Sequence, residues 1–285
     1  NKHGLYLDGS DSEVTNSIFA YNGAATVNAA GIYVDGVPGG APLIDGNTFL
    51  ENDYGLWAQS ANNLTVSGNT FTDNGVSAIN VSGAIGSFSG NSGSGNGVNA
   101  ILLSSSWAFG AATFLPNALP YYVQQDFNVS ASSTLAIADD VVVKGHDNTA
   151  SLGGRIVVKP GASITSSGAS SAGIIFTSEN DDTVGGDTAG DGAGTSPAAG
   201  DWFGIVVENG GFLNMSGFTI AYAGGNTSAS GDDRGGIKII GDIASSAISN
   251  ALFDSNYQYG VQVKDAGVLT VGTTTSQNHA LGKNL

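Results

Sequence analysis

The chain of 285 residues contains no cysteine, so neither disulfide bonds nor thiolate metal sites stabilise it. Charged residues make up only 11% of the sequence, and 8 Lys and Arg stand against 24 Asp and Glu, which gives a net charge of −16. Such a chain repels nucleic acid, anionic lipid and polyanionic sugars unless cations intervene. No apolar run approaches the roughly 20 residues that a membrane helix needs. We therefore expect neither nucleic-acid binding nor membrane insertion.

Small and turn-forming residues dominate what is present. The 44 glycines, together with abundant Asn, Ser and Thr, favour short strands and many turns over helices. At 41% hydrophobic content the chain can still bury a large core. With so little charge, the outer surface must be covered by Ser, Thr, Asn and Gly, and from this composition we expect an extracellular or cell-surface location.

A repeat organises the first part of the chain. Gly55-Leu56-Trp57-Ala58 returns as Ala78-Ile79-Asn80-Val81 and again as Ala100-Ile101-Leu102-Leu103, with starts 23 and 22 residues apart. Each repeat carries several short alternating apolar runs separated by Gly, Asn or Ser. A period near 22 without a helical pattern indicates that each repeat is one coil of a solenoid, which buries its inward face only by stacking on its neighbours.

Asparagine recurs at fixed places in these repeats. Asn16, Asn47 and Asn69 each precede an apolar residue, Asn22, Asn52, Asn74 and Asn96 close successive repeats, and Asn278 lies 22 residues after Asn256. Asn tolerates a left-handed backbone and bonds its own main chain, so it suits a sharp corner between strands. Stacked in register, the amides would form a ladder from coil to coil.

These features together resemble the right-handed parallel β-helix repeats of the pectin-lyase-like superfamily. The resemblance is carried by Gly-apolar-x-apolar, then a Leu-Thr-Val strand, then Asn-Thr-Phe and Asn-Gly, in four coils at the start and two at the end. It implies an all-β fold, a right-handed parallel β-helix of about ten to twelve coils, which is a rod of roughly 50 Å at the strand spacing of ~4.8 Å. Lyases, hydrolases, adhesins and structural proteins share this fold, so the resemblance does not specify an activity.

The pattern predicts two arrays. Residues 1–106 form the first array, residues 107–120 form a joint bracketed by Pro116 and Pro120, and residues 121–285 form the second array. The second array contains an acidic, glycine-rich loop at residues 180–200. The stretch from Phe176 to Ile205, in which this loop precedes Asp201-Trp202-Phe203-Gly204-Ile205, is similar to a recurrent module of large bacterial secreted surface proteins.

The acidic loop is the candidate metal site. It contains Asp181, Asp182, Asp187 and Asp191, with Asp201 at its exit. Asp187, Asp191 and the following glycine match positions one, five and six of a calcium loop, where carboxylates alternate and Gly permits the tight turn. Ala occupies position three and no Glu follows at position twelve, so the two interpretations are a Ca²⁺ site that rigidifies the loop and a solvated acidic insertion.

Three aromatic residues form the candidate contact surface. Tyr6, Tyr33 and Trp57 occupy the same position of successive coils. The strand alternation, with Leu5 and Leu7 pointing inward, predicts that this column faces outward. An exposed aromatic column suits carbohydrate stacking or a protein contact, and the alternative is a column covered by a neighbouring loop or subunit.

No set of residues converges on a catalytic pattern. A β-elimination lyase needs a basic catalyst and a basic or calcium subsite, yet the basic residues are scattered, with only Arg155 and Lys159 close in sequence. A hydrolase needs paired carboxylates across neighbouring coils. His3, His146 and His279 are isolated.

Neither end of the sequence carries a helix or a charged coil that would act as a cap, and Gly282 opens a further coil. Uncapped coils invite pairing with another chain, either a continuation or a second copy stacked head to tail. We therefore expect a non-catalytic extracellular structural or surface protein, with end-to-end self-association into a filament. The alternative is a polysaccharide lyase or hydrolase, or a carbohydrate-binding β-helix protein.

Overall fold

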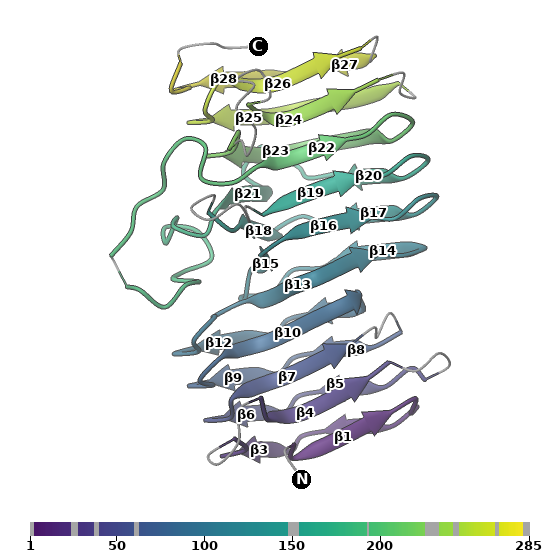
Figure 1. The fold of residues 1–285 in the computed structure, drawn as a ribbon, viewed down its shortest axis with the longest axis vertical. Coiled ribbons are helices and arrows are strands. Elements are labelled where there is room, and N and C mark those ends of the chain that lie inside the picture. Colours follow the sequence, from purple (N-terminus) through teal and green to yellow (C-terminus); the bar gives the residue numbers. More distant parts are fainter. Residues whose placement is uncertain are drawn as a thin grey trace.

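The structure of the protein is a computed structural model, which describes residues 3–23, 28–36, 40–59, 63–147, 154–192, 194–225, 234–241, 245–265 and 268–281. In these residues the secondary structure consists of 28 strands and no helix, and every strand pair is parallel. The coils stack into a rod, with the N-terminus at one end and the C-terminus at the other (Figure 1).

Twelve strands form the first four coils: β1 (Leu5–Asp8), β2 (Glu13–Thr15), β3 (Ile18–Ala20), β4 (Ala30–Asp35), β5 (Leu43–Asp45), β6 (Thr48–Leu50), β7 (Tyr54–Gln59), β8 (Thr65–Ser67), β9 (Thr70–Thr72), β10 (Ser77–Ala84), β11 (Ser87–Ser89) and β12 (Ser92–Ser94). Ten strands follow: β13 (Ile101–Ala108), β14 (Ala111–Phe114), β15 (Tyr121–Val123), β16 (Asp126–Val129), β17 (Thr134–Ile137), β18 (Val142–Gly145), β19 (Arg155–Val158), β20 (Ser163–Ser166), β21 (Ile174–Ser178) and β22 (Gly204–Val207). The last six are β23 (Phe212–Ala221), β24 (Gly235–Ile240), β25 (Ser246–Asp254), β26 (Tyr259–Lys264), β27 (Leu269–Val271) and β28 (Thr274–Gln277).

One long stack contains ten strands in the described residues, in the order β1–β4–β7–β10–β13–β16–β19–β22–β24–β26. In the first four coils, two further stacks of four strands each complete the cross-section, β2–β5–β8–β11 and β3–β6–β9–β12. This is the architecture of a parallel β-helix of about ten coils, as the repeat predicts.

Two asparagine ladders fix the corners of the first coils. In the first ladder the amide N–H of Asn47 donates to Asn69 Oδ1 (2.8 Å), and that of Asn69 donates to Asn91 Oδ1 (3.1 Å). The Nδ2 group of Asn69 also donates to the carbonyl of Ile44 in the preceding coil (2.9 Å). The second ladder contains Asn22, Asn52, Asn74 and Asn96. Each amide therefore satisfies main-chain groups that the turn would otherwise leave buried and unpaired.

The register corrects two details of the asparagine pattern. Asn16 does not belong to the first ladder: it adopts a left-handed conformation (φ 48°) at the position of Gly46, and the N–H of Ser17 donates to Asn47 Oδ1 (2.9 Å). Likewise Asn278 aligns with Ser255 rather than Asn256, because Asp254 pairs with Gln277. Sequence spacing alone misplaces both residues by one, because the left-handed corner and the ladder position are adjacent and both accept Asn.

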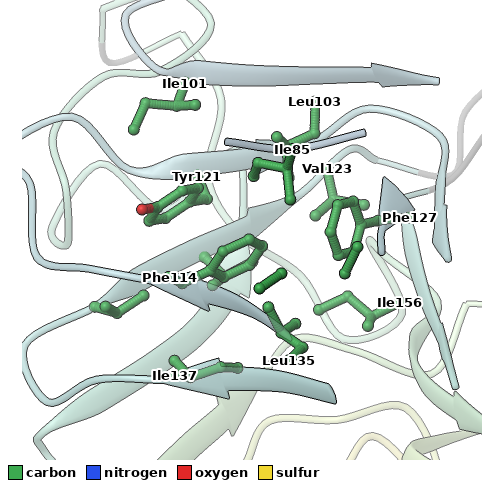
Figure 2. Close-up of a cluster of buried hydrophobic side chains, with 14 of the residues drawn as sticks. Ile85, Ile101, Leu103, Phe114, Tyr121, Val123, Phe127, Leu135, Ile137 and Ile156 are labelled. Carbon is green, nitrogen blue, oxygen red and sulfur yellow. The ribbon is translucent and has the colours of Figure 1, made fainter. Parts of the chain in front are cut away.

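The strand stacks are rearranged at residues 107–120. The two short stacks end at β11 and β12, while β13 pairs through its first half with β15 and through its second half with β16. Asn117 terminates the first ladder, and the buried hydroxyl of Tyr121 lies 3.1 Å from the carbonyl oxygens of both Phe88 and Leu115, to either of which it can donate. Figure 2 shows the apolar side chains that fill the interior here, and they belong to one core cluster that extends from Leu7 to Val261.

The interior follows from strict alternation along the strands. Ile32 and Val34 are buried while Tyr33 between them faces outward, and Leu56 and Ala58 flank Trp57 in the same way. Aromatic rings also stack from coil to coil inside, as Phe49 and Phe71 do with parallel rings 4.6 Å apart. Stacking thus buries the inward row that a single coil would expose.

Candidate functional site: an outward aromatic column and an acidic loop

The aromatic column lies where its spacing predicts. Tyr6 pairs in register with Tyr33, and Tyr33 pairs with Trp57, all on the outer face of the long stack. The tyrosine rings are parallel with centroids 5.4 Å apart, which is an offset stack, and the Trp57 ring meets Tyr33 edge-on at 5.2 Å. Tyr6 is 50% exposed, and Tyr33 and Trp57 are half-buried. The column therefore presents ring surface to solvent.

Polar side chains hold these rings in place. Tyr6 Oη donates to Asp35 Oδ2 (3.1 Å), and Tyr33 Oη donates to Gln59 Oε1. Burial and then the neighbouring Asp35 carboxylate raise the pKa of Tyr33, so the phenol stays protonated. The Nε1 atom of Trp57 is buried and has no hydrogen-bond partner. The column thus combines fixed aromatic rings with carboxylate and amide acceptors.

The same register column continues beyond Trp57 through Asn80, Leu102, Tyr122, Lys144 and Thr177. Here it is covered by the loop that joins β21 to β22, which projects to the left in Figure 1. The main-chain N–H of Asn99 donates to the main-chain carbonyl of Thr188 in this loop (3.0 Å). Leu102 and Tyr122 are consequently buried although they point away from the core.

Of the five aspartates expected to bind calcium, the structure brings three together. The carboxylates of Asp182, Asp187 and Asp191 offer oxygens that all lie within 4.8 Å of one another. Asp187 accepts the N–H groups of Gly190 (2.7 Å) and Gly192 (2.9 Å). Burial first and Asp187 second raise the pKa of Asp182, because like charges crowd the site. Hard carboxylate oxygens in this arrangement fit Ca²⁺.

The other two aspartates have different partners. Asp181 is buried and accepts the hydroxyls of Thr177 (2.7 Å) and Thr183 (2.5 Å). Asp201 Oδ2 accepts the hydroxyl of Ser178 (2.7 Å) and the N–H of Ala198 (2.9 Å). Asp201 therefore closes the neck of the loop, and Asp181 orders its first turn.

A buried lysine anchors the loop to the sheet. Lys144 is fully buried, and its Nζ donates to the backbone carbonyls of Asp181 (2.9 Å) and Gly186 (2.5 Å). Burial lowers the pKa of Lys144, while nearby carboxylates, Asp181 first, oppose that shift. The ammonium group therefore ties two backbone carbonyls of the acidic loop to strand β18.

The sequence analysis missed a cluster beside this lysine. Tyr122 Oη donates to Glu179 Oε2, and His146 Nδ1 lies 2.6 Å from Glu179 Oε1. The N–H of Asp147 donates to the same Oε1 atom (2.7 Å). Hydrogen bonding to Glu179 raises the pKa of His146, and burial raises that of Tyr122 far above its ordinary value. The only sequence signal is that Tyr122 continues the outward column.

The two basic residues considered for catalysis are paired with acids. Arg155 forms an ion pair with Asp126, and Lys159 Nζ lies 2.8 Å from Glu208 Oε1. Both pairs join neighbouring coils on the outer surface. Arg155 and Lys159 therefore serve to link neighbouring coils through ion pairs.

The comparisons with known proteins agree with the fold. Residues 1–117 match a family described as right-handed β-helix region. No curated protein and no solved structure matches the chain. Together with the parallel pairing of the described strands, the match supports a right-handed parallel β-helix fold. Among the described residues, no helix is long and apolar enough to cross a membrane.

Proposed function

We propose that this chain is a non-catalytic extracellular surface protein that binds carbohydrate through the column of Tyr6, Tyr33 and Trp57. The observation that carries the proposal is the in-register stack of outward aromatic rings on a rigid sheet. Sugar rings present apolar C–H faces, which pack on aromatic rings, and hydroxyls, which bond to polar side chains beside them. Asp35 and Gln59 lie at the tyrosine hydroxyls and supply such acceptors.

Charge specifies the class of sugar. Asp8 and Asp35 pair in register next to the column, and the chain as a whole carries a net charge of −16. Carboxylates here repel polyuronates and accept hydroxyl hydrogen bonds from neutral glycans. We therefore expect binding to neutral polysaccharides and none to polymers of uronic acids.

The test is affinity electrophoresis and calorimetry with soluble neutral polysaccharides and a polyuronate. Tyr33→Ala, which removes the central ring, should weaken binding to a neutral glycan at least 10-fold. Tyr21→Ala is the matched control, because Tyr21 is 65% exposed and lies at a corner away from the column. Equal affinities of the two variants, or no binding to any neutral glycan, would refute the proposal. Cleavage of any of these polymers would instead favour the lyase or hydrolase alternative.

A second role, end-to-end self-association, is favoured by the terminal coils. Val263 and Val271 point inward in β26 and β27 yet are 41% and 43% exposed, because no described coil covers them. At the other end Leu5, Val14 and Phe19 are only partly buried. Open strand edges and exposed inward rows of matching spacing accept another coil, and we propose that a second copy supplies it.

Electron microscopy of the purified chain, with and without a calcium chelator, tests this second role. Filaments with an axial repeat near one chain length are expected, and Val263→Glu should abolish them while Val268→Glu, outside the inward row, should not. Monodisperse short rods at high protein concentration would contradict self-association. Loss of filaments on chelation would implicate Asp182, Asp187 and Asp191.

A further inference from the structure

A second cluster of possible metal ligands lies where the acidic loop leaves the sheet. His146 directly follows β18, and Glu179 directly follows β21 in the next coil. Gly145 pairs in register with Ser178, so the two residues that follow them are neighbours across the coils. Asp147 follows His146. These side chains are therefore positioned by strand ends of the rod rather than by a long loop, which favours a preorganised site.

The donor atoms converge on one point. One nitrogen of His146 and one oxygen each of Asp147 and Glu179 all lie within 4.8 Å of one another. Ligands bound tetrahedrally at about 2.0–2.2 Å from a zinc ion lie about 3.3–3.6 Å apart, so small movements of the side chains suffice, inward for the more distant atoms and outward for the closest pair. His146 Nδ1 and Glu179 Oε1 are 2.6 Å apart and must separate by about 1 Å to admit the ion. The ion would take the place of the proton that these two atoms share.

We propose that His146, Asp147 and Glu179 form a binding site for a divalent transition-metal ion, for which Zn²⁺ is the probe. An imidazole nitrogen with two carboxylates is a donor set for Zn²⁺ and related ions, whereas Ca²⁺ takes oxygen ligands. With a neutral imidazole the two carboxylates carry two negative charges, which a dication neutralises. This neutralisation matters most for Glu179, because a buried charge without a partner is costly.

Neighbouring groups orient the ligands. Tyr122 Oη donates to Glu179 Oε2, and the N–H of Asp147 donates to Glu179 Oε1 (2.7 Å). The Tyr122 hydroxyl also lies 2.7 Å from His146 Nδ1, so it positions both ligands through hydrogen bonds. The His146 side chain is 28% exposed, so an ion can enter from solvent.

The site is separate from the three aspartates of the loop. Asp182, Asp187 and Asp191 supply oxygen alone and lie in the loop itself. The two clusters therefore predict opposite metal preferences in one protein, and each can be removed without changing the ligands of the other.

Calorimetric titration of the chelator-treated protein with ZnCl₂, and separately with CaCl₂, tests the proposal. One Zn²⁺ should bind with micromolar or tighter affinity. His146→Gln and Glu179→Gln should each weaken Zn²⁺ binding at least 100-fold, and Tyr122→Phe should weaken it about 10- to 100-fold. Circular dichroism confirms folding, and His146→Gln is the decisive variant because its side chain is partly exposed.

Asp140→Asn is the matched control, since it removes one exposed carboxylate elsewhere and keeps the left-handed backbone that Asn tolerates (φ 61°). It should bind Zn²⁺ like the wild type. The proposal is wrong if Zn²⁺ does not bind at millimolar concentration, or if His146→Gln binds it unchanged. It is equally wrong if Asp187→Asn abolishes Zn²⁺ binding while His146→Gln retains it.

Discussion

Replacing Asn69 by alanine tests whether the asparagine ladder stabilises the rod. Asn69 is fully buried, and its side chain makes four hydrogen bonds. Its Oδ1 accepts from Asn47 N (2.8 Å) and Asn47 Nδ2 (3.1 Å). Its Nδ2 donates to the carbonyl of Ile44 (2.9 Å) and to Asn91 Oδ1 (3.0 Å). Alanine removes all four while leaving the backbone ladder bond from Asn69 N to Asn91 Oδ1 (3.1 Å).

The expected loss follows from the groups left without partners. The N–H of Asn47 becomes unpaired in a closed interior, which costs about 1–3 kcal/mol. The carbonyl of Ile44 keeps its place in the strand ladder with β8 but loses its side-chain donor, and each such lost hydrogen bond costs about 0.5–1.5 kcal/mol. Asn91 Oδ1 still accepts from the main-chain N–H of Asn69, so losing the hydrogen bond from Asn69 Nδ2 costs less. We therefore expect Asn69→Ala to lower the free energy of unfolding by about 3–5 kcal/mol, which places it among strongly destabilising single substitutions.

Guanidinium unfolding and amide exchange at Asn47 provide the assay, and Asn16→Gly provides the matched control. Asn16 is an exposed asparagine of the same corner, in the left-handed conformation that Gly46 adopts one coil further on. Glycine fits this backbone without strain, so the control should change stability by less than about 1 kcal/mol. A loss below about 1 kcal/mol in Asn69→Ala, or equal losses in the two variants, would show that the ladder does not stabilise the fold.

Three further outcomes follow from the same structure. Ser17→Asn should extend the first ladder by one side chain and raise stability by about 0.5–1.5 kcal/mol, which an unchanged melting temperature would contradict. Calcium should bind the loop with a Kd of about 10⁻⁴–10⁻³ M, and Asp187→Asn but not Asp140→Asn should abolish that binding in calorimetry. Burial lowers the pKa of His279 below its ordinary 6.5, so the unfolded state takes up its proton first. The C-terminal coil should therefore lose stability as the pH falls from 6.5 through the lowered pKa. His279→Asn, in register with Asn256, should remove this dependence, and equal amide exchange of wild type and variant at pH 5 would refute it.

Much of the fold is encoded locally and could be predicted. The repeat that starts at Gly55, Ala78 and Ala100 reports the coil length directly, because each coil uses the same inward apolar row. Tyr33 faces outward because Ile32 and Val34 on either side of it point inward, a consequence of the two-residue period of a strand. The coil length and the outward face were therefore predicted correctly, whereas the recurring asparagine pattern misplaced Asn16 and Asn278 by one residue.

Features that depend on which coil contacts which loop could not be predicted from the sequence. Asp181 and Asp187 look equivalent in sequence, yet one is buried against Thr177 and the other caps a turn of the loop. His146 and Glu179 are 33 residues apart, and only the length of the intervening coil brings them together. A single sequence contains the spacing of these residues but not the path of the loop between them.

The outward column behaves differently along its length. From Tyr6 to Trp57 it is aromatic and partly exposed, and from Leu102 onward it is covered by the loop between β21 and β22. Apolar side chains on an outer face favour burial, so each such stretch calls for a cover or a partner. The loop covers the second stretch. By the same reasoning, the first stretch, from Tyr6 to Trp57, is where we propose that carbohydrate binds.

Lys144→Met tests whether the loop acts as this cover. Methionine keeps the apolar stem of the lysine but removes the ammonium, leaving the carbonyls of Asp181 and Gly186 without their donor. At about 1–3 kcal/mol for each unpaired group, docking should weaken by about 2–6 kcal/mol. The loop should then detach while the coils remain folded. Hydrogen exchange should report faster exchange at the Asn99 amide, which donates to Thr188 in the docked loop, and binding of an apolar dye should rise as Leu102 becomes exposed. If Asn99 stays protected in Lys144→Met, the loop is held by other contacts and the lysine is not its anchor.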